Sequence, residues 1–350
     1  MTPPSSELDA RLAEADPAFR AQIREDPVES TKTETIGALN QLAGLLVDLD
    51  DPGFVRTPQE YEGDQAAVDA VVHMGCHSIK TPVIVDATLD VVESLGYTPV
   101  GLGGFGNCCG IMDLKRGDVE AAEHADDNRF ENIAAFDPEV AIAECTSCHA
   151  ITSTLSLGYR DPEFAFPSFI EFLLNHVDEL NDAIQPGAPV PVALHEHFDG
   201  RGWSPDDQPA KARELMNQLD GVELVEMGDE GIPCNNTGDP AAYDVSNLND
   251  RILGSASSAG AEYVITFWHA CQASLLYEDH AHPATAKNIA TFLAERLGYE
   301  YRDVRREYVA AGARGELDWI VEDARPTFEA NGLSEATARD VAQEYFVTPS

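Results

Sequence analysis

The sequence predicts an α/β protein made of two pseudo-symmetric, cysteine-rich β-α-β halves with parallel strands, plus helical N- and C-terminal extensions. Two observations support this prediction. Short apolar runs of strand length alternate with helical patterns through most of the 350 residues, as they do in parallel β-α-β units. The same order of runs occurs twice, and an internal repeat constrains the fold more strongly than a single motif does.

The first half begins with the apolar run AVDAVVHM, which predicts a strand just before Cys76. The next stretch, TPVIVDATLDVVESLG, predicts a helix that stops at a glycine cap. TPVGLGG predicts the second strand, and it leads to Cys108 and Cys109. The alanine-rich stretch DVEAAEHADDNRFENIAAF predicts a helix, and PEVAIAE predicts the third strand, before Cys145 and Cys148.

The second half repeats this order. VPVALHEHF predicts a strand, QPAKARELMNQL a helix, GVELVEM a strand before Cys234, DVSNLNDRILGSASSAG a helix, and EYVITFW a strand that reaches Trp268. The interval from Cys76 to Cys145 is 69 positions, and the interval from Phe198 to Trp268 is 70. We therefore interpret this part of the chain as a tandem duplication.

These patterns divide the chain into four segments: a helical extension, a first cysteine-rich domain, a second and degenerate one, and a C-terminal helical extension. Their bounds are 1–66, 67–185, 186–300 and 301–350. The first extension is expected to contain helices near 6–24 and 31–49, and the stretch SFIEFLLNHVDELNDAI between the two domains is expected to form one amphipathic helix. Neither extension carries a cysteine, so we assign both to structural cover or docking.

Composition narrows the classes of function. The chain has 62 Asp and Glu against 22 Lys and Arg, a formal net charge of -40. Nucleic acids and anionic membranes bind clustered Lys and Arg, so the composition excludes both as partners. Repulsion between the acidic groups is screened within about 3 Å at 1 M salt, which favours a cytoplasmic protein of a halophile that accumulates salt.

The cellular compartment is predicted from the N-terminus and the apolar runs. The first residues lack the cationic and apolar regions of a signal peptide, and no apolar run reaches the roughly 18 residues of a membrane span. We therefore expect a cytoplasmic protein without direct membrane insertion. In a reducing compartment, the seven cysteines are expected to be metal ligands or catalytic groups.

Five of the seven cysteines follow the three predicted strands of the first half. Because the ends of parallel strands meet at one edge of a sheet, these thiols are expected to converge. A structural zinc site uses four ligands, and the spacing lacks the C-x2-C-x2-C run of ferredoxins. Soft thiolates favour zinc, copper(I) or iron-sulfur clusters, and of these the clusters most readily use more than four sulfurs. The five candidate ligands are Cys76, Cys108, Cys109, Cys145 and Cys148.

The motif of Cys76, Cys-Cys-Gly at 108–110 and Cys-x-x-Cys at 145–148 resembles the CCG, or cysteine-rich, domain of the B subunit of heterodisulfide reductase. Similar tandem domains occur in glycolate and lactate oxidase iron-sulfur subunits, in the C subunit of anaerobic glycerol-3-phosphate dehydrogenase and in some succinate:quinone reductases. The resemblance covers about residues 68–298. It implies that the five cysteines bind a non-cubane [4Fe-4S] cluster that delivers electrons to cleave a disulfide.

The second half departs from this motif. Phe198 replaces the first cysteine, Cys234-Asn235-Asn236 replaces Cys-Cys-Gly, and Trp268 replaces the first cysteine of the final pair. A second cluster of the same type is therefore not expected. The histidines and cysteines that form a candidate second site are His195, His197, Cys234, His269 and Cys271.

Three interpretations of this second set remain open. The two cysteines with His269 and either His195 or His197 would suit a Cys2His2 zinc site, since imidazole and thiolate both favour zinc. The same side chains would otherwise line a substrate pocket, in which a histidine moves protons near neutral pH. In the third interpretation the set is a relic, with Phe198 and Trp268 filling the space of the lost ligands.

The resemblance implies an iron-sulfur oxidoreductase subunit that receives electrons from a flavoprotein or ferredoxin-type partner and passes them to a disulfide or another acceptor. A first alternative is the electron-relay subunit of a glycolate- or lactate-type oxidase complex, in which the cluster only conducts. A second alternative is a metal-binding or assembly module without turnover. No nucleotide site is expected, because the glycines of GLGGFGNCCG lead into cysteines where a pyrophosphate would lie.

Overall fold

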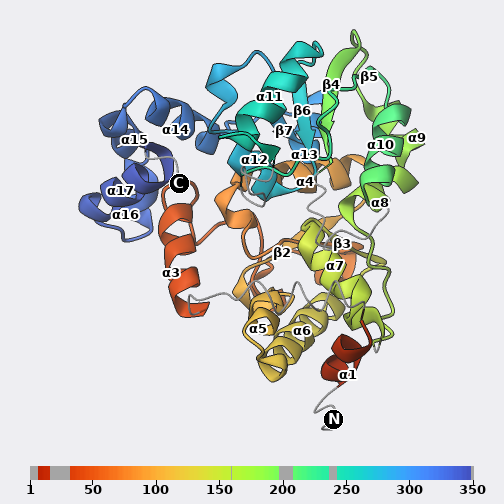
Figure 1. Cartoon of the computed structure of the whole chain (residues 1–350). Coiled ribbons are helices and arrows are strands. Elements are labelled where there is room, and N and C mark those ends of the chain that lie inside the picture. Colours follow the sequence, from red (N-terminus) through yellow and green to blue (C-terminus); the bar gives the residue numbers. More distant parts are fainter. Residues whose placement is uncertain (1–6, 16–31, 159, 197–207, 236–242, 348–350) are drawn as a thin grey trace.

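The computed structural model describes most of the chain and shows an α/β protein with two parallel sheets (Figure 1). This architecture confirms the predicted fold class. The described residues are 7–15, 32–158, 160–196, 208–235 and 243–347.

The first half contains a three-stranded parallel sheet in the order β2-β1-β3. Every residue of β1 and β3 is buried, as expected for parallel strands that helices cover on both faces. The strands are β1 (Ala70–His73), β2 (Pro99–Leu102) and β3 (Val140–Ala143), and all three lie in the predicted runs. The helices are α4 (Pro82–Ser94), α5 (Ile111–Lys115), α6 (Val119–Ala134), α7 (Thr146–Thr154), α8 (Phe169–Asn175) and α9 (Val177–Ala183).

The second half contains a four-stranded parallel sheet in the order β5-β4-β6-β7. Its first three strands are arranged as in the first sheet. In each half, the strand that comes first in the sequence lies between the second and the third. The strands are β4 (Val190–His195), β5 (Val222–Leu224), β6 (Tyr263–Thr266) and β7 (Thr285–Asn288). The helices are α10 (Gln208–Gln218), α11 (Leu248–Ser258), α12 (His269–Leu275) and α13 (Ile289–Leu297).

Strand β7 is absent from the predicted elements, because its short sequence TAKN lacks an apolar run of strand length. The first half has a counterpart of β7 that pairs with β3 through isolated bridges only. Isolated parallel bridges join Val140 to Ala165 and Ala143 to Ser168. Each segment ends at a polar residue that caps the next helix, Ser168 before α8 and Asn288 before α13. The repeat therefore includes one more element than the sequence pattern indicates.

The single helix predicted between the halves is two helices, α8 and α9, separated at His176. The backbone of His176 leaves the helical region, with φ -121° and ψ 23°. Its ring Nδ1 lies 2.8 Å from the carbonyl oxygen of Phe172, and its Nε2 lies 3.0 Å from the hydroxyl of Tyr97. These contacts stabilise a bend that helical periodicity alone does not reveal.

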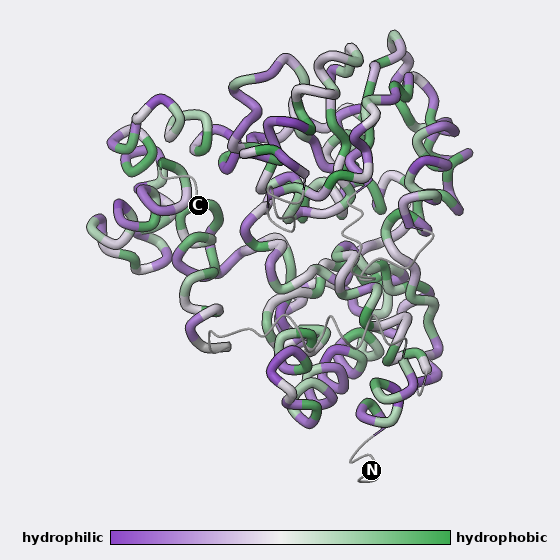
Figure 2. The backbone as a smooth tube through the Cα atoms, in the orientation of Figure 1, coloured by the Kyte–Doolittle hydropathy of each residue, from purple (hydrophilic) through white to green (hydrophobic). Residues whose placement is uncertain are grey.

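The two halves pack through two pairs of helices, and the repeat makes these two pairs equivalent. Helix α4 of the first half packs against α13 of the second, and α8 packs against α10. A single hydrophobic cluster spans this contact and includes Ile84, Phe172, Leu215 and Phe292. Figure 2 shows hydrophobic segments gathered inside each half and hydrophilic ones on the outer helices. The shared core fixes the position of one sheet relative to the other.

Helices from both ends of the chain pack together on one side of the molecule (Figure 1). Asn331 fixes this contact, because its side-chain amide donates to the carbonyl oxygens of Gly44 and Val47 and accepts from the amide of Leu49. Helix α3 is shorter than the helix predicted near 31–49. The helices of this group are α3 (Lys32–Ala43), α14 (Val304–Ala313), α15 (Leu317–Asp323), α16 (Arg325–Ala330) and α17 (Glu335–Ala342).

Helix α1 (Glu7–Glu14) packs elsewhere, against α6 of the first half. It accounts for the start of the helix predicted near 6–24, and the rest of that prediction lies outside the described residues. Among the described helices, none combines the length and apolar character needed to cross a bilayer. Short helical turns occupy Pro58–Glu60, Gln65–Ala67, Ser78–Lys80, Phe105–Asn107, Ser156–Gly158 and Asp279–Ala281, and a π-helix occupies Gln343–Val347.

Candidate metal centre

The five cysteines of the first half lie after the C-terminal ends of its strands. Cys76 follows β1, Cys108 and Cys109 follow β2, and Cys145 and Cys148 lie after β3 at the start of α7. All five are free thiols, three of them buried and two half-buried. The parallel order of the strands places them at the same edge of the sheet.

Interactions between neighbouring thiols link all five side chains in series. Cys76 interacts with Cys108, and Cys108 interacts with Cys109. Cys109 interacts with Cys148, which in turn interacts with Cys145. The bond with Cys148 lowers the pKa of Cys145 to about 7, although burial opposes this shift. The bond with Cys108 and burial together raise the pKa of Cys76.

Two glycines allow the cysteine loops to approach their neighbours. A Cβ atom at Gly75 would lie 2.7 Å from the Cβ of Cys145. Gly110 has a φ of 77°, and a Cβ atom there would lie 2.7 Å from the carbonyl oxygen of Ala122. A larger residue at either position would displace the backbone that carries the thiols.

Apolar side chains cover part of the five-cysteine site. Leu8 and Leu12 of α1 belong to the same buried cluster as Cys109 and Cys148. Trp268, from the second half, also packs against this cluster. The cover reduces contact with water, and electrostatic interactions are stronger in such a low-dielectric environment.

Histidines next to the cysteine loops bind other protein groups. The Nε2 atom of His73 lies 2.8 Å from the carbonyl oxygen of Asn107, the residue before Cys108. Burial, with a smaller effect from Arg129, lowers the pKa of His73 to about 4, so the neutral ring donates this hydrogen bond. The His149 ring lies 3.2 Å from the carboxylate of Glu171. We infer that both rings hold the loops in place.

Glu144 is a buried carboxylate beside the site that the sequence patterns do not single out. It directly follows β3 and accepts a hydrogen bond of 2.6 Å from the hydroxyl of Ser78. The Nδ1 atom of His269, on α12, lies 3.7 Å from its Oε1 atom. Burial opposes ionisation of Glu144, but the interactions with His269 and Ser78 lower its pKa overall. Its place between an apolar strand and Cys145 is the signal that could have identified it.

The second half brings together three of its five candidate residues. The ligand atoms of His195, Cys234 and Cys271 all lie within 4.8 Å of one another, and all three side chains are buried. The two sulfurs are 3.7 Å apart. His269 instead lies beside Glu144, and His197 is outside the described residues.

The contact of Cys234 with Cys271 indicates which cysteine of the first half corresponds to Cys234. The sequence comparison sets Cys234 at the first position of the Cys-Cys-Gly trio. In the structure Cys234 contacts Cys271, as Cys109 contacts Cys148 in the first half. Both Cys148 and Cys271 are the third residue of the helix that follows a strand. We therefore match Cys234 with Cys109.

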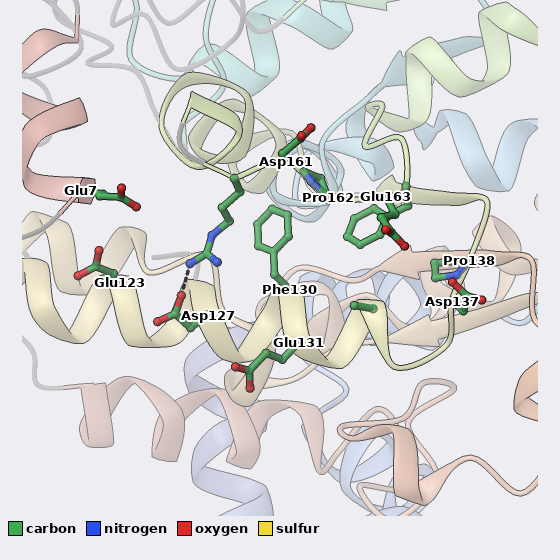
Figure 3. Close-up of a pocket in the computed structure, with 13 residues that line it drawn as sticks. Glu7, Glu123, Asp127, Phe130, Glu131, Asp137, Pro138, Asp161, Pro162 and Glu163 are labelled. Carbon is green, nitrogen blue, oxygen red and sulfur yellow. Dashed lines mark hydrogen bonds and ion pairs between the residues drawn. The ribbon is translucent and has the colours of Figure 1, made fainter.

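A cavity of about 570 Å³ lies away from the cysteines, on the outer face of α6. Figure 3 shows the carboxylates of Glu123, Asp127, Glu131 and Glu163 around the ring of Phe130. No cysteine or histidine lines it. We assign it no part in the chemistry of the thiols.

Residues 70–151 match the family model of the cysteine-rich CCG domain. This confirms the predicted resemblance for the segment that contains all five cysteines of the first motif. The match does not extend to the second half. A comparison with curated proteins finds no match. A CCG domain is typical of redox subunits and indicates metal or iron-sulfur binding.

Proposed function

We propose that the first half holds a non-cubane [4Fe-4S] cluster and that the chain is an oxidoreductase subunit resembling the B subunit of heterodisulfide reductase. The observation that carries this proposal is the convergence of five free thiols at one edge of a parallel sheet. The match of residues 70–151 to the CCG domain supports it. The proposed ligands are Cys76, Cys108, Cys109, Cys145 and Cys148.

The donor set suits an iron-sulfur cluster better than a single metal ion. Five thiols exceed the four ligands of a tetrahedral zinc site, and thiolates are the usual ligands of iron-sulfur clusters. Gly75 allows its loop to approach Cys145 closely, and Gly110 allows the loop of Cys108 and Cys109 to approach the backbone of Ala122. Because bound thiolates are deprotonated, loading the site releases protons.

Once bound, the cluster supplies one-electron transfer. The surrounding residues position the ligands and limit the access of water. Leu8 and Leu12 cover the buried thiols, and Asn107 is held by the ring of His73. Glu144 and His269 place an ion pair next to Cys145, so both halves contribute to the surroundings of the site.

A redox subunit also needs an electron donor, and we propose a flavoprotein or ferredoxin-type partner. The net charge of -40 disfavours electrostatic steering toward a partner that is equally acidic. Apolar contacts would then dominate docking. The cysteine-free helical extension at the N-terminus is the proposed docking element.

A reductase reduces a disulfide at its cluster, whereas a relay subunit does not, so disulfide reduction distinguishes the two functions. Anaerobically purified protein is reduced with dithionite, freed of excess reductant and mixed with 2-hydroxyethyl disulfide, and the thiol product is measured. Each disulfide takes up two electrons and two protons to give two thiols, so two reduced chains are needed per disulfide and we expect about one thiol per reduced cluster in the wild-type protein. A loss of at least about tenfold is expected in Cys109→Ser, since removing one ligand disrupts the cluster.

A matching spectroscopic measurement uses the oxidised protein. Adding 2-mercaptoethanol is expected to change the EPR signal of the oxidised cluster, because a thiol product held close to the cluster would alter the surroundings of its iron. If the cluster is intact by iron content but neither thiol formation nor the EPR change occurs, the reductase proposal is wrong and the cluster acts as a relay.

A further inference from the structure

The set of His195, Cys234 and Cys271 has the dimensions of a site for a single metal ion. Zinc bonds to thiolate sulfur at about 2.3 Å, so a tetrahedral ion places two sulfurs about 3.8 Å apart. The sulfurs of Cys234 and Cys271 are 3.7 Å apart. The ligand atom of His195 lies within 4.8 Å of both.

The polar character and burial of this set do not favour the relic interpretation. His195 ends the central strand β4 and is only 1% exposed, and Cys234 and Cys271 are fully buried. A neutral imidazole is a good metal ligand, whereas packing alone would need only small hydrophobic residues in the same space.

A polar network holds the loop of Cys234 against the helix that carries Cys271. The side-chain oxygen of Asn235 accepts from the amide of Leu248 at 2.8 Å. The amide of Asn235 donates to the side chain of Asn249 at 2.9 Å, and Asn249 donates to the carbonyl oxygen of Ser274 on α12. The two sulfurs are therefore fixed by three connected segments, as preorganised metal sites require.

The neighbouring strand β6 carries a buried hydroxyl, that of Thr266, beside His195. Thr266 is the register partner of His195 in the parallel pair of β4 and β6. Its side chain is fully buried, and its Oγ1 atom has no hydrogen-bond partner among the described residues. Outer hydrogen bonds of this kind orient metal ligands and metal-bound water.

We propose that His195, Cys234 and Cys271 bind one zinc ion, independently of the five-cysteine site. Two thiolates and one imidazole form a donor set that suits zinc, and three protein ligands leave one coordination position for water or a small ligand. Among the described residues, no fourth His, Cys, Asp or Glu joins the set. His269 is not part of it, because its ring faces Glu144.

Metal content in matched cysteine variants tests this proposal separately from the proposed cluster. Protein is purified anaerobically and its zinc and iron are measured by mass spectrometry. We expect about one zinc per chain in the wild type, and a loss of about tenfold in Cys234→Ala and His195→Ala with iron unchanged. Cys76→Ala is the matched control, in which iron is lost and zinc remains.

Cobalt substitution gives a second measurement, made only on protein whose fold has been checked. Apo protein that keeps its wild-type circular dichroism is titrated with Co²⁺. Thiolate-to-cobalt absorption that saturates at about one equivalent in Cys76→Ala, and is displaced by Zn²⁺, supports the site. The proposal is overturned if this absorption is missing, or if thiol counting shows that Cys234 and Cys271 form a disulfide in the anaerobic protein.

Discussion

The Oε1 atom of Glu144 lies 3.7 Å from the Nδ1 atom of His269, and this buried ion pair joins the two halves beside the five-cysteine site. Glu144 ends the third strand run of the first half, and His269 begins α12 of the second. Burial opposes the charge on both groups, but their mutual interaction lowers the pKa of Glu144 and raises that of His269. The two halves are therefore coupled at the site as well as through their shared core.

A double-mutant cycle measures this coupling. Removing one member of a buried pair leaves the other charge without compensation, so Glu144→Gln and His269→Gln are each expected to lower the free energy of unfolding by about 2–4 kcal/mol. The double variant is expected to lose at least about 1 kcal/mol less than the sum. Urea denaturation of the anaerobic protein gives all four values. Losses that add within about 0.5 kcal/mol would show that the pair does not couple the halves.

Gly110 is the position where a small substitution should damage the site most. Gly110→Ala would combine a left-handed backbone with a contact of 2.7 Å to the carbonyl oxygen of Ala122. We expect a loss of about 2–4 kcal/mol in the free energy of unfolding, together with a lower iron content.

Gly117→Ala is the matched control for this substitution. Gly117 has a similar φ of 80°, but nothing lies within 4 Å of a Cβ atom there. Only the backbone strain remains, so the expected cost is about 1–2 kcal/mol, with unchanged iron content. Equal losses in the two variants would contradict the role assigned to the contact between Gly110 and Ala122.

The interactions of Glu171 predict a pH dependence of stability. His149 lowers the pKa of this carboxylate, and Lys211 and the amide of Ser168 add to the effect against the opposing effect of burial. A depressed pKa in the folded state stabilises the protein above the unfolded value of about 4.5, and this contribution is lost as the pH falls below it.

Glu171→Gln is therefore expected to cost about 1–2 kcal/mol at pH 7 and progressively less below pH 4.5. Urea denaturation between pH 3 and pH 7 gives this difference. Glu93→Gln, which replaces an exposed glutamate of α4, is the matched control variant. A cost for Glu171→Gln that stays constant down to pH 3 would contradict the assignment.

The strands that deliver the cysteines could be predicted from sequence because each is a short apolar run that ends before a thiol. Strand β7 could not, since TAKN becomes a strand by pairing with β6 and not by its own composition. The bend at His176 likewise depends on a contact with Tyr97, which is 79 positions away in the chain.

In the candidate site, too, the sequence predicts what depends on strand order and misses what depends on contacts between the two halves. The motif spacing was sufficient to group the five cysteines, because parallel strands end at one edge of a sheet. Spacing alone could not separate His269 from His195, since that choice depends on the position of Glu144 in the other half.

The central claim is that the five cysteines of the first half hold an iron-sulfur cluster, and the most direct test is the iron and acid-labile sulfide content of anaerobically purified protein. We expect about four iron and four sulfide per chain, and loss of both in Cys109→Ser. Cys234→Ser is expected to keep them. Zinc without sulfide at the five cysteines would contradict this claim.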